Sequence, residues 1–126
     1  MSRAYARAHA SACQDALHDP PEWGFEVRLL AGGGAITAFG ELDLSVADRL
    51  EDLARALRPE PGDRIVADFS RVTFIDSSIV AFLLRVAARV DARDATLVVV
   101  AQPDGEVRRT LRVCDAEGAL GLAVTG

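Results

Sequence analysis

The chain has 126 residues, which is long enough to bury one ordinary hydrophobic core. Half of its residues are hydrophobic and 26% are charged, a balance typical of a globular protein rather than of a disordered segment. The net charge is -5 and every basic residue is an arginine, so binding to nucleic acid is not expected. The absence of lysine also excludes a P-loop and a Schiff-base lysine, and Gly32-Gly33-Gly34 is therefore not a phosphate cradle.

The cysteines and histidines show no spacing typical of a metal site. Cys13 and Cys114 are far apart and predict two free thiols in a reducing compartment. His9 and His18 have no other ligand types clustered near them. No apolar run approaches the roughly 20 residues that span a bilayer, and the N-terminus lacks a secretory apolar segment. We therefore expect a cytoplasmic protein with no metal, no cofactor and no direct membrane insertion.

Residues 1–22 are expected to be an N-terminal extension of the domain. The segment is rich in alanine and weakly helical, but it has no clear apolar face, and Asp19-Pro20-Pro21 breaks it. It is interpreted as either a flexible tail or a loosely docked helix. The compact domain is predicted to occupy residues 23–126.

The first part of the domain predicts a β-hairpin followed by a helix. Apolar and charged residues alternate over 25–29, the three glycines permit a turn, and residues 35–39 form the returning strand. Ser45 and Asp48 then resemble a capping arrangement at the start of a helix that ends before Pro59. The expected inward face of this helix consists of Val46, Leu50, Leu53, Ala54 and Leu57.

Strands and helices alternate through the rest of the chain. Residues 64–69 predict a strand that 72–75 extend, and residues 95–101 predict a strand buried on both faces. Asp104 is expected to cap a last helix, whose inward residues would be Val107, Leu111 and Val113. Residues 118–124 would return as a short edge strand. The fold class is therefore α/β, a hairpin followed by a mostly parallel sheet with helices mainly on one face.

Asp76-Ser77-Ser78 lies where the strand pattern stops and a helix pattern begins. A carboxylate and two hydroxyls at a helix start lie beside free backbone N–H groups, which suits a cap, an anion or a modification. Helical spacing directs Ile79, Phe82, Leu83, Val86 and Val90 inward. The outer face is small and mildly apolar, and it is either a docking surface or an ordinary solvated face. It consists of Ser77, Ser78, Ala81, Leu84, Arg85 and Ala88.

Two segments resemble a known family. One is Phe39-Gly-Glu-Leu-Asp-Leu-Ser45, followed by an amphipathic helix. The other is Asp68-Phe-Ser-Arg-Val-Thr-Phe-Ile-Asp-Ser-Ser78, followed by an apolar helix. Together they resemble the STAS domain of bacterial anti-sigma factor antagonists, over about four-fifths of the chain from Phe25 onward.

The resemblance implies a binding module that is switched by phosphorylation. In that family the second serine of the motif is phosphorylated by a partner that is both an anti-sigma factor and an ATP-dependent serine kinase. By position this serine is Ser78, and Ser77 is the less favoured acceptor. The unphosphorylated form binds the kinase and frees the sigma factor, and a PP2C-type phosphatase restores that form. The ATP belongs to the kinase, so the chain itself needs no cofactor.

The resemblance extends to a partner surface and leaves one alternative open. It suggests that Asp43 and its helix start join Asp76, Ser77, Ser78, Ala81, Leu84 and Arg85 in binding the partner, although Asp43 alone also fits a turn or cap residue. The family usually has glycine after the phosphoserine, whereas this chain has Ile79. Ile79 favours the alternative, a constitutive STAS scaffold in a signalling or transporter assembly without phosphorylation.

An enzyme is not predicted. A serine hydrolase needs a base near its nucleophile and usually a Gly-x-Ser-x-Gly elbow, which is absent here. Both histidines lie in residues 1–22, so a catalytic triad would require that segment to fold back. No catalytic residue is therefore assigned.

Overall fold

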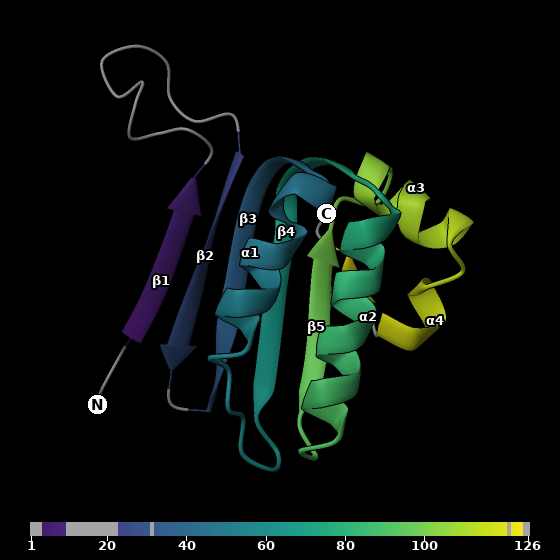
Figure 1. The fold of residues 1–126 in the computed structure, drawn as a ribbon. Coiled ribbons are helices and arrows are strands. Elements are labelled where there is room, and N and C mark those ends of the chain that lie inside the picture. The colour runs from purple at the N-terminus through teal and green to yellow at the C-terminus, as the bar shows by residue number, and fades with distance from the viewer. Residues whose placement is uncertain (1–3, 10–22, 31, 121, 125–126) are drawn as a thin grey trace.

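A computed structural model describes residues 4–9, 23–30, 32–120 and 122–124, with ten helices and strands in this part of the chain (Figure 1). The side chains of 4–9, 29–30 and 122–124 are not described. Residues 10–22 of the predicted extension, with Cys13 and His18, lie outside the described residues. The other cysteine, Cys114, is an exposed free thiol, as predicted.

A single sheet runs through the molecule in the order β1-β2-β3-β4-β5-β6. Its first two pairings are antiparallel and the next three are parallel. The prediction of an α/β fold with a hairpin and a mostly parallel sheet is therefore confirmed. The strands are β1 (Ala4–His9), β2 (Trp23–Leu30), β3 (Gly33–Leu42), β4 (Arg64–Ile75), β5 (Thr96–Ala101) and β6 (Leu122–Val124).

Four helices connect these strands: α1 (Leu44–Ala54), α2 (Ser77–Asp91), α3 (Glu106–Val113) and α4 (Glu117–Leu120). Helices α1 and α2 lie beside each other over one face of the sheet, and α3 and α4 contact α2 on the same side (Figure 1). The hydrophobic core fills the space between these helices and the sheet. The inward residues of β3, β4 and β5 alternate with half-exposed ones, as expected for a sheet that is covered on one face.

The strand β1 differs from the tail or loosely docked helix that was expected in residues 1–22. It pairs with β2 in antiparallel register, from Ala4 opposite Leu29 to His9 opposite Gly24. The sequence Ala-Tyr-Ala-Arg-Ala-His alternates small and large residues with a period of two, which is the strand period. Alanine content suggested a helix because it raises helix propensity, but pairing with the open edge of β2 overrides that weak preference.

The turn between β2 and β3 confirms the predicted hairpin. Gly33 has a φ of +146°, and a Cβ there would lie 1.8 Å from the carbonyl oxygen of Arg64. Only glycine permits this close approach between the start of β3 and the start of β4.

The C-terminal part of the chain, from α3 onward, differs from the sequence prediction in three respects. Gly105, not Asp104, occupies the N-cap of α3, and no side chain caps this helix. Val107 and Leu111 are buried as expected, but Val113 is 80% exposed. Six residues at about 100° each put Val113 roughly 120° away from Val107 around the helix, and therefore off the inward stripe. The edge strand predicted at residues 118–124 is shorter than expected and consists of β6 alone, because residues 117–120 form α4.

Candidate functional site

The helices α1 and α2 begin side by side at the carboxyl end of two parallel strands. Leu42 and Ile75 are register partners at the ends of β3 and β4, and each strand is followed at once by an aspartate and then a helix. Asp43 is the N-cap of α1 and Asp76 is the N-cap of α2. Two segments that are 32 residues apart in sequence therefore bring their helix N-termini together.

Bulges in β4 determine how this strand reaches the site. The register with β3 shifts between Thr37 and Phe39, where β4 uses one residue more than its partner. Asp68 accepts hydrogen bonds from the amide and hydroxyl of Ser70 at this point, at 3.0 and 2.6 Å. An extra residue changes which face each later side chain occupies. The bulge at Asp68-Phe-Ser70 therefore sets the register of the second half of β4, and with it the position of Asp76 at the end of the strand.

Asp76 joins the two helix starts through both of its carboxylate oxygens. Its Oδ1 accepts hydrogen bonds from the amides of Ser78 and Ile79, at 3.0 and 3.3 Å. Its Oδ2 accepts the amide of Leu44, the first residue of α1, at 3.0 Å. One side chain thus satisfies free N–H groups on two helices, where a negative charge also interacts favourably with both helix dipoles.

The hydrogen bonds also determine the protonation of Asp76. Partial burial of the carboxylate tends to raise its pKa, because burial disfavours the charged form. Hydrogen bonds from the Ser78 hydroxyl and from the amides of Ile79, Leu44 and Ser78 outweigh this effect, so the pKa of Asp76 lies below its ordinary value. Asp76 is therefore a firmly ionised acceptor at neutral pH and a weak proton acceptor for chemistry.

Ser78 is half-buried, and its hydroxyl donates a hydrogen bond to Asp76 Oδ1. Ser77 is exposed in the first turn of α2. The cap of α2 is Asp76, so neither serine hydroxyl caps the helix. The same arrangement recurs at α1, where Asp43 Oδ1 accepts the amide and hydroxyl of Ser45 at 2.9 and 2.5 Å. Asp43 is thus the cap that the sequence interpretation assigned to Ser45 and Asp48.

Ile79 points into the core and is 0% exposed. The side chain that replaces the family's usual glycine therefore does not lie over the Ser78 hydroxyl. The predicted inward stripe of α2 is confirmed, because Ile79, Phe82, Leu83, Val86 and Val90 are all buried.

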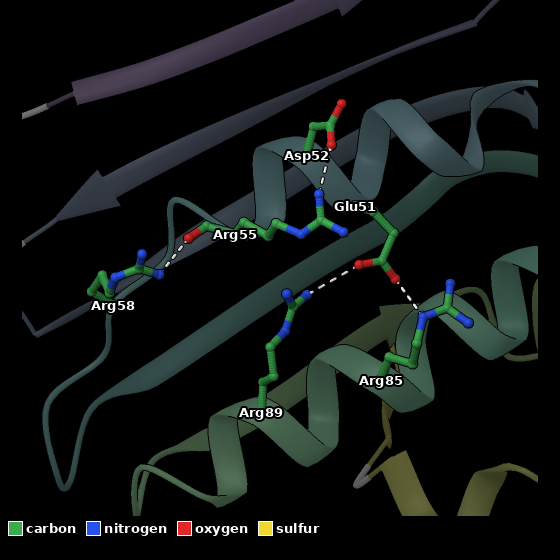
Figure 2. A network of polar contacts seen from close by, with 6 residues as sticks. All are labelled: Glu51, Asp52, Arg55, Arg58, Arg85 and Arg89. Carbon is green, nitrogen blue, oxygen red and sulfur yellow. Dashed lines mark hydrogen bonds and ion pairs between the residues drawn. The ribbon is translucent and has the colours of Figure 1, made fainter.

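The outer face of α2 presents the predicted partner-binding residues to solvent to different degrees. Ala81 and Leu84 are half-buried, whereas Arg85 and Ala88 are exposed. Arg85 forms an ion pair with Glu51 of α1, so its guanidinium is held over the boundary between the two helices (Figure 2). This face continues along the helix from Ser77 and Ser78.

Two large apolar residues near the helix starts were not singled out from the sequence. Leu44 is 71% exposed and Phe74 is 41% exposed, and both lie at the end of the sheet that carries Asp43 and Asp76. Leu44 is the first residue of α1 and lies away from the buried face of this helix, so helical periodicity could have predicted its exposure. The exposure of Phe74 depends on the register shift between Gly40 and Glu41, which the hydrophobic pattern does not reveal.

The family model described as Mlab, STAS domain matches residues 25–123. The chain belongs to the STAS domain family. The resemblance found in the sequence is therefore confirmed at the level of the family. No curated protein matches the chain.

Two solved structures share the fold of this STAS domain. One is an anti-sigma factor antagonist from Mycobacterium paratuberculosis, with a TM-score of 0.62, 17% identity, and coverage of 79% of this chain and 84% of that one. The other is the anti-sigma factor antagonist SpoIIAA in its unphosphorylated form, with a TM-score of 0.62, 19% identity, and coverage of 81% and 88%. At these identities the likeness shows the fold.

Neither a metal-ligand cluster nor a membrane-spanning helix is found in the described part of this STAS domain. Across residues 4–9, 23–30, 32–120 and 122–124, no three His, Cys, Asp or Glu side chains group so as to hold a metal ion. In the same ranges, no helix combines the length and apolarity that crossing a bilayer requires.

Proposed function

We propose that this STAS domain is an anti-sigma factor antagonist that binds an anti-sigma factor with serine kinase activity. It binds this partner when Ser78 is unphosphorylated and releases it when Ser78 is phosphorylated. The observation that carries the proposal is the Ser78 hydroxyl, held by the ionised Asp76 at the start of a helix with a small, mildly apolar outer face. Both similar structures are of proteins named as anti-sigma factor antagonists, which supports the same assignment.

Phosphorylation would transfer the γ-phosphoryl group of ATP to Ser78 Oγ, with loss of the hydroxyl proton and release of ADP. Asp76 acts in this step as a positioning residue, because its hydrogen bond to the hydroxyl directs the oxygen lone pairs. Its lowered pKa makes it a poor recipient for the proton. The general base, like the ATP, therefore belongs to the kinase.

The phosphate would act mainly through its charge. It adds about 1.5 to 2 negative charges beside Asp76 and removes the hydroxyl that donates to Asp76 Oδ1. The nearby helix N-terminus offsets part of this repulsion. No arginine stands three or four residues after Ser78, so the helix itself offers no clamp for the phosphate. The added charge and bulk therefore oppose docking on the α2 face, with little change of fold.

The partner surface is proposed to include both helix starts. It combines Asp43, Asp76, Ser77 and Ser78 with the outer face of α2 at Ala81, Leu84 and Arg85. Leu44 and Phe74 are added here, because two exposed large apolar side chains beside polar helix caps suit a protein interface. A PP2C-type phosphatase would reverse the modification, and the domain itself is proposed to be a cytoplasmic binding module without catalysis.

No specific observation favours the constitutive scaffold. Ile79 was the sequence feature behind that alternative, and its side chain is buried in the core instead of lying against Ser78. A β-branched residue is therefore compatible with kinase access at this position.

The test is phosphosite analysis after incubation with ATP and each candidate anti-sigma kinase from the source organism. We expect incorporation of one phosphate at Ser78, abolished by Ser78→Ala and retained by Ser77→Ala. Ser78→Asp should weaken kinase binding by about tenfold or more while leaving the far-UV circular dichroism unchanged. A kinase that binds the domain tightly but never phosphorylates Ser78 would contradict the proposal and favour the constitutive scaffold.

A further inference from the structure

A second surface lies further along α1 and α2, and it shares Arg85 with the partner surface proposed above. A cavity of about 330 Å³ opens between the C-terminal end of α1 and the second half of α2. Its apolar lining comes from Ala54, Leu57, Val86 and Val90, which are buried core residues that reach the bottom of this groove. The groove is therefore large enough for one or two apolar side chains of a ligand.

Arginine side chains line the rim of this groove. Arg55 and Arg58 follow α1, whereas Arg89 lies in the last turn of α2 and Arg93 follows that helix. A neighbouring cavity shares Arg55 and Arg89 and adds Arg85. Figure 2 shows Arg85 and Arg89 reaching from α2 towards Glu51 of α1, with Arg55 along α1 and Arg58 on the chain that follows it. We call this surface the arginine groove: Arg55, Arg58, Arg85, Arg89 and Arg93 around the apolar floor.

Part of the positive charge is balanced within the protein. Glu51 is only 13% exposed and accepts both the Arg85 Nε and, at 3.4 Å, an Arg89 nitrogen. Arg55 pairs with Asp52 at 2.9 Å, but both side chains are largely exposed, so this pair is weak. These contacts leave most of the donors of the three guanidinium groups unused, since each guanidinium carries five N–H groups.

The remaining two arginines are held by backbone instead of by carboxylates. Arg58 donates to the carbonyl oxygen of Arg55, and Arg93 Nε donates to the carbonyl oxygen of Pro59 at 2.8 Å. These bonds orient the guanidinium groups without using a carboxylate. The two cavities are lined by five arginines and one carboxylate, Glu51, whereas the whole chain carries a net charge of -5.

We propose that the arginine groove binds an acidic peptide segment of a partner protein, with an apolar side chain inserted between α1 and α2. Carboxylates of the segment would pair with Arg55, Arg58, Arg89 and Arg93, whose planar forks match carboxylate geometry. Its apolar side chain would cover the floor at Leu57 and Val90. This goes beyond the proposed function, because it does not require Ser78 to be modified.

The chemistry of the groove favours a peptide over other anions. A nucleic acid or an anionic membrane carries extended negative charge that would also face the acidic remainder of the molecule, whereas a short acidic segment faces the groove alone. A free inorganic anion would use the guanidinium groups but not the apolar floor. Only a ligand with carboxylates spaced around an apolar side chain uses both features, and arginine is among the residues most enriched at protein interfaces.

The test uses a fluorescein-labelled peptide of about 12 residues, built from repeats of Glu-Glu-Leu-Leu, which is about 18 Å long as a helix. The matched probes are a Glu-Glu-Ser-Ser peptide, a Lys-Lys-Leu-Leu peptide, inorganic phosphate and phosphatidylglycerol vesicles. Fluorescence anisotropy gives the affinity, and ¹H–¹⁵N spectra locate the bound peptide. The variant Arg55→Glu/Arg89→Glu is compared with Arg109→Glu, an exposed arginine on α3 that pairs with Glu106.

The acidic Leu-containing peptide is expected to bind with a Kd below about 1 mM and to shift the amides of residues 54–59 and 86–93. Its affinity should fall by about tenfold in Arg55→Glu/Arg89→Glu and stay unchanged in Arg109→Glu. Absence of binding overturns the proposal. So does equal binding of the serine peptide, of phosphate or of the vesicles, because each outcome removes the need for an apolar anchor on an acidic peptide. The outcome of this binding experiment does not depend on whether Ser78 is phosphorylated, so the two proposals can fail separately.

Discussion

The prediction that tests the site most directly concerns Asp76, whose two oxygens join α1 and α2. Asp76→Ala removes the cap of α2 and the acceptor for the Leu44 amide. Loss of an N-cap costs about 1 kcal/mol. Loss of an additional, largely solvent-accessible hydrogen bond adds about 1 kcal/mol. We therefore expect the free energy of unfolding to fall by about 2 kcal/mol.

This loss corresponds to a measurable shift in melting temperature. An unfolding entropy of about 2.1 cal/mol/K per residue gives roughly 0.26 kcal/mol/K for a chain of this length. The Tm of Asp76→Ala should then fall by about 8 °C. Asp76→Asn keeps one carbonyl oxygen for the Ser78 amide but presents an NH₂ group, a donor, towards the Leu44 amide. It should lose about half as much, or about 4 °C.

The pH dependence follows from the lowered pKa of Asp76. Since the pKa is lower in the folded state than in the unfolded state, folding stabilises the ionised form. The stabilisation is complete above the unfolded-state pKa of about 4 and is lost as pH falls through the folded-state value. The difference in Tm between the wild type and Asp76→Asn should therefore be constant near neutral pH and shrink on acidification below about pH 4.

Thermal melts by circular dichroism between neutral and acidic pH measure these differences, and hydrogen exchange at the Leu44 amide reports on the bridge itself. The Leu44 amide should exchange faster in both variants. Asp48→Asn is the matched control, because Asp48 is exposed on α1 and the substitution makes the same change in charge. The reasoning is refuted if Asp76→Ala and Asp76→Asn are equally stable at neutral pH, or if Leu44 exchange is unchanged.

Two further predictions concern residues near the site. Ile79→Ala should lower the free energy of unfolding by about 2–5 kcal/mol, because it opens a cavity in the core. It should not speed phosphorylation of Ser78 in a kinase assay. A faster reaction would mean that Ile79 obstructs the kinase. Glu51→Gln should lower the free energy of unfolding, measured in urea, by about 1 kcal/mol, since it removes the carboxylate that Arg85 and Arg89 share while both arginines remain partly solvated. An unchanged urea midpoint would show that this pairing adds nothing to stability.

Hydrophobic periodicity predicted the elements that pack the core. The alternation in β2 and β3 and the helical stripe of α2 were readable because burial is what selects those residues. The strand β1 was missed because alanine carries little hydrophobic signal, so only its size alternation marks the strand. Val113 was predicted wrongly because apolar character does not by itself place a residue on the inward side of a helix; its angle around the helix axis decides this.

The contacts of the site depend on register, and local patterns do not encode register. The sequence predicted that Asp43 and Asp76 both follow strands. It could not show that Asp76 Oδ2 accepts the Leu44 amide, because that bond depends on how β3 and β4 align over several residues with two register shifts. The same shifts decide that Phe74 is exposed. The arginine groove likewise arises from two helices that come together only after the sheet has formed.

Asp76 explains why a modification at Ser78 should act locally. The carboxylate contributes about 2 kcal/mol through its hydrogen bonds, whereas a domain of this size has a net stability of about 5–15 kcal/mol. Even complete loss of its contacts would leave the buried stripe of α2 packed against the sheet. A phosphate on Ser78 would therefore disturb the two helix starts without unfolding α1 or α2. The partner would then sense a change of charge at Ser78, Asp76 and Leu44 on an otherwise constant surface.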